Sequence, residues 1–428
     1  MMRRLKKMAT VALLPALLPA LIVAGTAHAA AGDASLANAS VVRGRYVATT
    51  GDCVACHTAG KGRAFAGGYA LETPFGKIVS SNITQDVKTG IGGWSEQEFI
   101  RAVRQGKGRH GENLYPAMPY NAYVKVSDAD MHDLWAYMKT VAPVSNHVDA
   151  DQLPFPFNIR LLMSGWNLFF FDNTPFKDDP KQSVEWNRGA YLVDGLGHCA
   201  ACHTAKNFLG GDASGKGLQG GLLAGWYAPE ITGNRQLGIG DWSVEQTAEY
   251  LQTGGNAITV ASGPMGEAVA NATQHMSTAD LRAIAVYLKS QPGSTGEQAA
   301  PIAASDHQMM LGAKIYSINC EACHATGGKG IPNMVAALAG NSAMHAHTDN
   351  NLLNAVLRGT RGVATKSNPT GAAMPSFAWK LTDDQIAAAL TYVRNSWGNG
   401  APAVTAASVA AARKTLVLPG QSVFTAQK

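Results

Sequence analysis

Charged residues are scarce in this sequence. They make up 15% of the 428 residues, whereas hydrophobic residues make up 46%. This composition excludes a disordered or fibrous chain and is typical of globular proteins. The formal net charge of +5 does not indicate nucleic-acid binding, because four of the 35 basic residues and none of the 30 acidic ones lie at positions 1–29. Without that stretch, 31 basic residues balance 30 acidic ones, and no basic patch for nucleic acid is predicted.

No hydrophobic run in the sequence reaches the ~20 residues that a membrane-spanning helix needs. The apolar run at 11–25 follows basic residues at 3–7, contains two prolines and ends just before the Ala-His-Ala of 27–29. This order predicts a cleaved export signal over 1–29. The most apolar later stretch, LLMSGWNLFFF at 161–171, is also too short to span a bilayer. We therefore expect a mature chain outside the cytoplasm that is soluble or peripheral.

Motifs of several common enzyme classes are missing as well. A dinucleotide-binding GxGxxG after a strand, a P-loop and an HExxH helix do not occur in the sequence. The glycine-rich stretch GLQGGLLAG at 217–225 lacks the glycine spacing of a dinucleotide-binding loop. It predicts only a loop near the CxxCH motif at 199–203, which is described below. We expect no substrate chemistry from this chain by itself.

Cysteine occurs only in three CxxC pairs, and a histidine directly follows each pair. The three motifs are Cys53, Cys56 and His57, then Cys199, Cys202 and His203, then Cys320, Cys323 and His324. CxxCH is the attachment signature of c-type haem. The two thiols add to the two vinyl groups of the porphyrin, and the histidine is thereby held under the iron as its proximal ligand. The sequence therefore predicts three covalently attached c-type haems.

Other uses of paired cysteines leave part of the pattern unexplained. Six cysteines in an exported chain could pair as disulfides in about 15 ways, but the regular spacing argues against it. A thioredoxin-like CxxC has no use for three copies that each end in histidine. Two CxxC pairs could share one zinc ion, and the third pair and the histidines would then remain without a role.

The three motifs belong to an internal repeat. Residues 43–59 align with 188–205, and residues 81–99 align with 229–247, so the first two copies are near duplicates. The third copy begins near 311, is shorter, and keeps a glycine and a tyrosine ahead of its cysteines. Each copy is expected to begin with a helix that runs into the haem attachment.

A second helix is predicted at the end of each copy, and the three ranges are 127–141, 277–290 and 382–396. Each has a Ser or Thr N-cap candidate with Asp or Gln three residues later, which is a capping box or a near variant. These pairs are Ser127 with Asp130, Ser277 with Asp280 and Thr382 with Gln385. A tyrosine ten residues after each cap is expected in the buried stripe of its helix. These tyrosines are Tyr137, Tyr287 and Tyr392.

One methionine precedes the last helix of each copy. These methionines are Met118 in YPAMPY, Met265 in SGPMGEA and Met374 in AAMPSF. A haem iron that shuttles electrons needs a second axial ligand, and a thioether in that position raises the reduction potential. We predict that the three methionines are the distal iron ligands, each presented by a proline-rich turn.

Other side chains remain open as ligands. Methionine is more often core filler, and Met276 and His275 are rivals of Met265. In the third copy, His345 and His347 are alternatives that would give a bis-histidine iron. His198 directly precedes Cys199 and is badly placed to reach the far face of its own haem.

Together these residues resemble the three-haem cytochrome c subunit of bacterial membrane-associated dehydrogenases that oxidise alcohols, sugars, sugar acids or aldehydes in the periplasm. The resemblance covers nearly the whole mature chain and rests on GDCVACHT, SNIT, LYPAMPY, LPFPFNIR and WNRGAYLVDGLGHCAACHT. It implies three covalent haems with distal methionines. It also implies electron transfer to ubiquinone from a separate catalytic subunit that carries a flavin, a pyrroloquinoline quinone or a molybdenum cofactor, and it allows for a further small subunit.

The family also implies a place at the periplasmic face of the inner membrane. Some relatives end in a hydrophobic anchor helix, which the tail at 407–428 lacks. One candidate for another membrane contact is the segment 155–171, whose Trp166 and Phe169 to Phe171 suit an interface. The alternative is a linker that packs between the first two copies.

The expected fold is all-α, with three tandem class I cytochrome c domains, each wrapped around one covalently attached haem. The expected divisions are 1–29 (signal peptide), 30–141 (first domain), 142–186 (linker with an aromatic segment), 187–290 (second domain), 291–308 (flexible linker), 309–398 (third domain) and 399–428 (tail).

Two other functions remain open beside the relay subunit. A multihaem enzyme such as a peroxidase would keep one iron open, and a soluble shuttle to a terminal oxidase would differ only in its partner. A methionine in the matching position of every copy favours closed iron sites and hence electron transfer.

Overall fold

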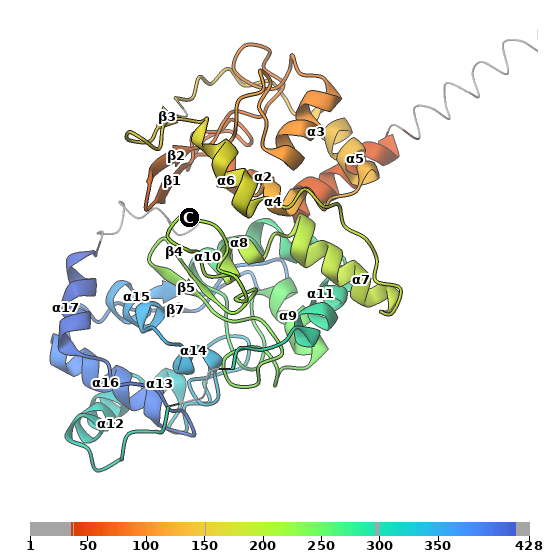
Figure 1. Ribbon diagram of the computed structural model, residues 1–428. Coiled ribbons are helices and arrows are strands. Elements are labelled where there is room, and N and C mark those ends of the chain that lie inside the picture. The colour runs from red at the N-terminus through yellow and green to blue at the C-terminus, as the bar shows by residue number, and fades with distance from the viewer. Residues whose placement is uncertain (1–35, 37, 150, 296–298, 417–428) are drawn as a thin grey trace, which may run out of the picture.

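The computed structural model describes residues 36, 38–149, 151–295 and 299–416. The predicted export signal at 1–29 and the last part of the tail lie outside these residues. Figure 1 shows the red-to-yellow start of the described chain at the top, the green middle below it and the blue end at the lower left. Within the described ranges, no helix is both long enough and apolar enough to cross a membrane.

The fold is rich in helices. Residues 38–50 are helical and lead into α2 (Cys53–Cys56). Next come α3 (Glu96–Gln105), α4 (Tyr120–Tyr123), α5 (Asp128–Met138), α6 (Leu162–Phe170) and α7 (Val184–Tyr191), which continues as the π-helix η1 (Leu192–Leu196). The middle of the chain forms α8 (Ala200–His203), α9 (Val244–Thr253), α10 (Gly263–Asn271), the 3-10 helix η2 (Thr273–His275) and α11 (Thr278–Ser290). The last helices are α12 (His307–Asn319), α13 (Glu321–His324), α14 (Ser342–His345), α15 (Asn350–Arg358), α16 (Asp383–Asn395) and α17 (Ala406–Lys414).

Short antiparallel sheets accompany the helices, which the expectation of an all-α fold did not include. The first sheet has the order β1 (Ala70–Thr73), β2 (Gly76–Val79) and β3 (Asp151–Gln152). The other two are β4 (Gly221–Leu223) with β5 (Trp226–Ala228), and β6 (Thr360–Arg361) with β7 (Ala373–Met374). The β4–β5 turn has positive φ at Ala224 and Gly225, as a two-residue type I′ hairpin requires. The glycine-rich stretch predicted as a loop thus contains the first strand and the turn of a hairpin.

The three terminal helices predicted from sequence are present as α5, α11 and α16. Their N-caps are confirmed, because the side chain of each cap residue accepts a hydrogen bond from the backbone N–H three residues later. The reciprocal bond of a capping box forms between Gln385 and Thr382. Asp130 and Asp280 instead use their carboxylates to accept hydrogen bonds from tyrosines of another copy.

Each terminal helix lies directly against the first helix of its own copy at a glycine. The crossings pair Gly44 with Asp133, Gly189 with Ala283 and Gly312 with Ala388, where an added Cβ would come within 2.1 Å of a backbone oxygen. Any side chain at these glycines would push the helices apart, so the backbones touch. The predicted tyrosine follows one turn later, with its Cβ over the same glycine. Of the three, Tyr287 is buried, whereas Tyr137 and Tyr392 are half-buried.

The first two copies share one hydrophobic core. Fully buried side chains from both copies belong to it, among them Met131, Leu192 and Leu281. A separate core lies in the third copy and contains Ile386 and Val409.

A reciprocal pair of tyrosines joins the first two copies. The hydroxyl of Tyr46 donates to Asp280 Oδ2 at 2.6 Å and accepts from the N–H of Ser277 at 3.1 Å, at the start of α11. In the other direction, the hydroxyl of Tyr191 donates to Asp130 at the start of α5. Each copy therefore lends one tyrosine to the terminal helix of the other.

The linker predicted at 142–186 packs on the first copy and extends beyond it. It adds β3 to the first sheet, and Tyr120 contacts Trp166 and Phe171 in edge-on ring pairs. Phe169 is 76% exposed. The segment thus has a packed side and an exposed side.

The buried carboxylate of Asp280 gives a test of the contact between copies. Arg188 donates to both its oxygens at 2.7 and 2.8 Å, in addition to the bond from Tyr46. Burial opposes ionisation, but these bonds outweigh it and hold the pKa of Asp280 below its ordinary value. A depressed pKa stabilises the fold above the unfolded-state pKa of ~3.9, and this contribution is lost as the pH falls through the folded-state value.

We expect Asp280→Asn to lower the free energy of unfolding by about 1–3 kcal/mol at pH 7, because the amide NH2 that replaces one carboxylate oxygen cannot accept a hydrogen bond from Arg188 or Tyr46. Urea unfolding at pH 7 and pH 3 measures this, and the difference from wild type should shrink at pH 3. Asp241→Asn is the control, since Asp241 forms an exposed pair with Arg235 that contributes roughly 0–1 kcal/mol. Equal loss in both variants would contradict the assignment.

Candidate haem-attachment sites

Each CxxCH motif folds as a single helical turn. The N–H of the histidine donates to the carbonyl of the first cysteine in all three copies: His57 to Cys53 at 3.0 Å, His203 to Cys199 at 2.9 Å and His324 to Cys320 at 2.9 Å. Residues four apart lie on the same helix face. The imidazole and the first thiol of each motif therefore face the same side.

Every motif histidine is also hydrogen-bonded through its ring to a backbone carbonyl. The Nδ1 atoms lie 2.7 Å from the carbonyl oxygen of Ser81 for His57, 2.7 Å from that of Pro229 for His203, and 3.1 Å from that of Ala336 for His324. A carbonyl only accepts, so Nδ1 carries the proton. The lone pair is then left on Nε2, which is the nitrogen that an iron under this ring would bind.

A second constraint holds the backbone of each histidine. Its carbonyl accepts the N–H of a glycine: Gly67 at 2.8 Å from His57, Gly220 at 2.8 Å from His203 and Gly330 at 3.0 Å from His324. These glycines have φ values of 73°, 95° and 59°, in the left-handed region that other residues rarely adopt. The loop after each motif thus closes onto the histidine.

The sequence predictions missed both partners of the histidine, although a signal for them was present. Ser81 and Pro229 occupy the same position in the aligned stretches 81–99 and 229–247. Their shared role rests on a backbone carbonyl, so residue type does not reveal it.

The chemistry of the six thiols and three imidazoles suits covalent haem. All six cysteines lie among the described residues and are unpaired with one another. Burial raises the pKa of Cys53 and of Cys199 to about 12 and that of Cys320 to about 11, so these thiols stay protonated. Burial also lowers the pKa of the three motif histidines, which favours the neutral ligating form.

The zinc alternative has no support in the geometry. Over the residues that the structure describes, no group of three or more His, Cys, Asp or Glu side chains is placed to hold a metal ion. Haem attachment needs one imidazole per motif, which is what each motif offers.

The three predicted distal methionines are half-buried but lie in different local structures. Met118 lies in a tight turn, where its carbonyl accepts from Tyr120 N–H at 2.7 Å. Met265 lies in the first turn of α10, just after Pro264, rather than in the turn that was predicted. Met374 does not lie in the predicted turn either, because it belongs to β7 and pairs with Thr360.

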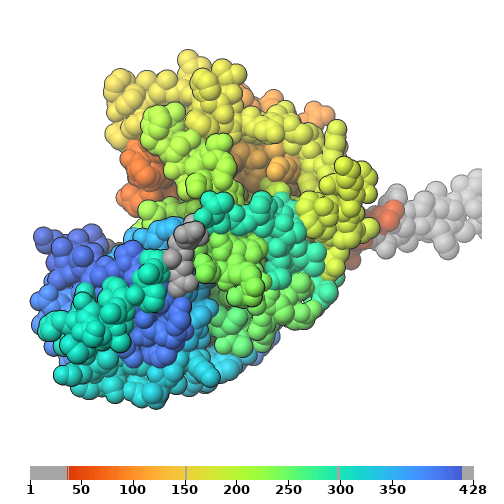
Figure 2. Space-filling model, turned by 60° about the horizontal axis from the view of Figure 1, so that its bottom comes forward, coloured from red at the N-terminus to blue at the C-terminus, as the bar shows by residue number. Residues whose placement is uncertain are grey.

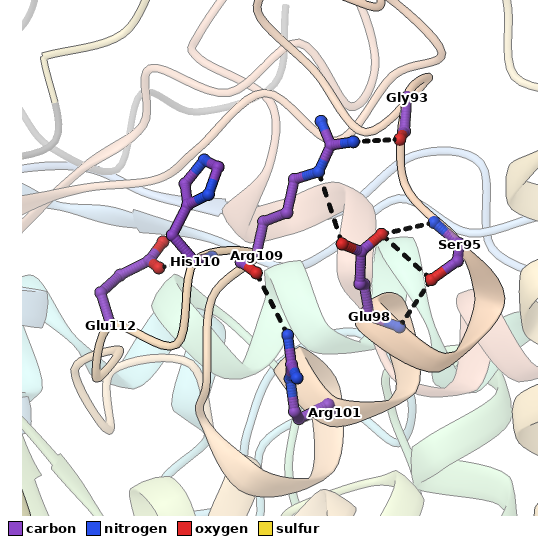
Figure 3. A network of polar contacts seen from close by, with 7 residues as sticks. All are labelled: Gly93, Ser95, Glu98, Arg101, Arg109, His110 and Glu112. Carbon is purple, nitrogen blue, oxygen red and sulfur yellow. Dashed lines mark hydrogen bonds and ion pairs between the residues drawn. The ribbon is translucent and has the colours of Figure 1, made fainter.

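The loop that leads to Met118 is held by a polar network (Figure 3). Ser95 caps α3 and exchanges hydrogen bonds with Glu98. These hydrogen bonds, and the positive charge of the neighbouring Arg109, lower the pKa of Glu98. The guanidinium of Arg109 lies 3.5 Å from Glu98 and donates to the carbonyl of Gly93 at 2.6 Å. Arg101 donates to the carbonyl of Arg109 at 3.1 Å. These hydrogen bonds and the ion pair hold the loop between α3 and the turn that contains Met118.

The rival ligands have other surroundings. Met276 is buried in the core shared by the first two copies, and the Nε2 atom of His275 lies 3.1 Å from the carbonyl oxygen of Ala270. In the third copy His345 is half-buried and His347 is exposed.

The residues just before the first and second motifs are in direct contact. The ring of His198, the residue before Cys199, packs edge-on against Tyr123, and its Nε2 lies 3.3 Å from the carbonyl oxygen of Gly51. Tyr123 donates to the same carbonyl at 2.8 Å. Helix α10, which carries Met265, also contacts α2. His198, which we expect to be badly placed to reach the far face of its own haem, thus joins the segments that lead into the first two motifs.

The second and third copies are joined by backbone hydrogen bonds rather than only by the linker predicted as flexible. Asn333 donates to Asn256, Ala337 to Ile258 and Val363 to Ala261, at distances of 2.9 to 3.0 Å. These bonds connect the loop before Met265 with segments on both sides of α14 and α15. The described part of the linker is anchored too, since Ser294 donates twice to the buried Glu230.

These features define a c-type cytochrome with more than one attachment site, and comparison with known proteins agrees. The cytochrome c family model matches residues 41–142 and 309–397. The chain is 38% identical to the gluconate 2-dehydrogenase cytochrome c subunit of Pantoea cypripedii, over 92% of this chain and 94% of that protein. It is 37% identical to the cytochrome c subunit of the quinone alcohol dehydrogenase of Gluconobacter oxydans, over 90% of this chain and 83% of that protein.

A further relative is longer than this chain. One of the subunits of the nicotinate dehydrogenase of Pseudomonas putida is 41% identical over 378 residues, which are 87% of this chain but 31% of that protein. The chain belongs to the family of cytochrome c subunits of dehydrogenase complexes, as the sequence resemblance predicted.

Proposed function

We propose that this chain carries three covalent c-type haems and relays electrons from a catalytic dehydrogenase subunit to ubiquinone at the periplasmic face of the membrane. The observation that carries the proposal is the threefold recurrence of one geometry, a CxxCH turn whose histidine ring is oriented by a backbone carbonyl. Each bound haem would supply a one-electron ferric–ferrous couple. The chain itself contributes attachment, orientation and burial.

The residues that would hold these groups are the ones predicted from sequence. The six cysteines would form the thioethers, and His57, His203 and His324 would bind iron through Nε2. Met118, Met265 and Met374 would bind from the other side. Three tandem cytochrome c domains at 30–141, 187–290 and 309–398 follow from this, and the three glycine crossings support that division.

The second site would be the middle of the relay. His198, just before the second motif, contacts Gly51, just before the first, and the methionine loop of the second copy is hydrogen-bonded to the third copy. Within the described residues, these contacts support the order first, second, third without assigning which end receives electrons.

The partner would be a dehydrogenase subunit acting on an alcohol, sugar, sugar acid or aldehyde, with a flavin, pyrroloquinoline quinone or molybdenum cofactor. Support comes from the relatives, which are named as cytochrome subunits of gluconate and alcohol dehydrogenases. The family resemblance also allows for a further small subunit in the proposed complex. The quinone role is supported by the name of the alcohol dehydrogenase relative.

Replacing Met374 by alanine tests the distal ligands. We expect one of the three haems to become high-spin and its reduction potential to fall, because the thioether that favours ferrous iron is gone. Optical and magnetic circular dichroism spectra measure the spin state. Met334→Ala is the matched control, since Met334 is 54% exposed in the same copy. Unchanged spectra for Met374→Ala would show that another residue caps the third site.

Purification from the native membrane tests the role in a complex. We expect a dehydrogenase subunit with an organic or molybdenum cofactor to accompany the cytochrome, and quinone reduction to require the substrate of that subunit. Mass spectrometry and a ubiquinone-reduction assay measure both. A cytochrome that purifies alone and turns over peroxide would support the enzyme alternative instead.

A further inference from the structure

The residue directly after the carbonyl that orients each motif histidine is buried in all three copies, but its chemistry differs. These residues are Asn82 in the first copy, Glu230 in the second and Ala337 in the third. One matched position therefore holds a neutral amide, a carboxylate and a methyl group. Only the second copy can carry a charge there, one residue away from the partner of a predicted iron ligand.

The carboxylate of Glu230 is satisfied by hydrogen-bond donors rather than by a cation. Its Oε1 accepts from the N–H of Ser294 at 2.9 Å and from the hydroxyl of Thr232. Its Oε2 accepts from the hydroxyl of Ser294 at 2.6 Å. An ionised carboxylate only accepts hydrogen bonds, so these donors stabilise the charged form. No ion pair among the described residues includes Glu230, so its negative charge is not neutralised there.

Ser294 lies in the linker that leads to the third copy, and this part of the linker is fixed. The side-chain amide of Asn234 donates to the carbonyl of Ser294 at 3.1 Å, and the N–H of Gly233 donates to the carbonyl of Gln291 at 3.1 Å. The third copy then packs against the second, blue against green in Figure 2. The contact with the linker leaves Glu230 only 3% exposed.

The first copy uses the matched position without a charge. The amide group of Asn82 donates to the carbonyl of Val144 at 2.8 Å and to the hydroxyl of Thr89 at 3.0 Å. Its Oδ1 accepts from the N–H of Thr84 at 2.9 Å. The position thus needs a donor and an acceptor, which a neutral amide supplies. The two near-duplicate copies differ here by one buried charge.

A carboxylate beside a motif does not always carry a charge. Asp52 directly precedes Cys53, and its Oδ1 is buried without a hydrogen-bond partner. Burial, together with the negative charge of Glu267, raises the pKa of Asp52 to about 8, so this carboxyl is mostly protonated at pH 7. Glu230 differs from Asp52 because hydrogen-bond donors compensate for its burial.

We propose that Glu230 lowers the reduction potential of the second haem, an effect that the matched positions of the other two copies lack. The proposal rests on the proposed function, because it requires a haem at His203. A fixed negative charge stabilises ferric iron more than ferrous iron, which carries one positive charge less. Because the carboxylate is buried, salt screens this effect only weakly. Sites with the same predicted ligands thereby acquire different potentials.

Glu230→Gln tests the charge, because glutamine keeps the shape of the side chain and can still accept from the N–H of Ser294. We expect one of the three midpoint potentials to rise. The ferrous-to-ferric ratio of that haem at the wild-type midpoint should increase about tenfold, which corresponds to about 59 mV for a one-electron couple. Redox titration of the full haem-loaded chain at pH 7, followed by absorption spectra, measures the three midpoints.

Further variants separate the charge from a structural role. Ser294→Ala removes a hydroxyl donor and keeps the charge of Glu230, so no midpoint should rise. Glu245→Gln is the matched control, since the side chain of Glu245 is 70% exposed in the same copy, and it should leave all three midpoints unchanged. Met265→Ala identifies the second haem, because the midpoint that falls in this variant should be the one that rises in Glu230→Gln.

The reverse exchange, Asn82→Asp, places a carboxylate at the matched position of the first copy. We expect a different midpoint to fall in this variant. It decides the question if Glu230→Gln fails to fold or to take up haem, which circular dichroism and the haem content per chain reveal.

Two results would overturn the proposal. One is a loaded Glu230→Gln variant, or in its place Asn82→Asp, whose midpoints all match the wild type. The other is an equal rise in Ser294→Ala, which would assign the effect to the linker contact. Failure of the proposed function is distinguishable, since a chain whose haems take no electrons from a dehydrogenase partner would lose the relay and keep the shift.

Discussion

Direct backbone contact between two helices determines where each haem motif lies. At Gly44, Gly189 and Gly312 the first helix of a copy touches its terminal helix, and no Cβ fits between them. The first helix runs into the CxxCH turn, so clamping it against the terminal helix fixes the place at which the histidine emerges. The left-handed glycine and the carbonyl partner of each histidine then set the orientation of its ring.

The same terminal helices also connect the copies. The hydroxyls of Tyr46 and Tyr191 donate to aspartates in the first turns of α11 and α5, respectively. The N-terminal turns of these two helices therefore also connect the first copy to the second. This contact brings Gly51 against His198, next to two attachment sites. In the proposed relay, such a contact between CxxCH motifs would keep water away from the attached haems and fix their separation.

The sequence predicted the features that depend on side-chain type and missed those that depend on the backbone. The N-caps at Ser127, Ser277 and Thr382 and the family resemblance are confirmed, and the CxxCH residues stay predicted haem ligands. The carbonyl partners of the histidines could not be predicted, because any residue type supplies a carbonyl. Met265 in a helix was missed because Pro264, taken as a turn signal, also suits the first turn of a helix. The small sheets escaped prediction because each strand has four residues or fewer.

Electron transfer by this chain, as proposed, depends on three covalently bound haems, one at each clamped histidine. The pyridine haemochrome content per chain, combined with the intact mass of the denatured protein, measures their number directly. We expect three haems per polypeptide, all retained after acid–acetone extraction. Fewer than three haems, or pigment that passes into the organic phase, would refute three covalent attachments.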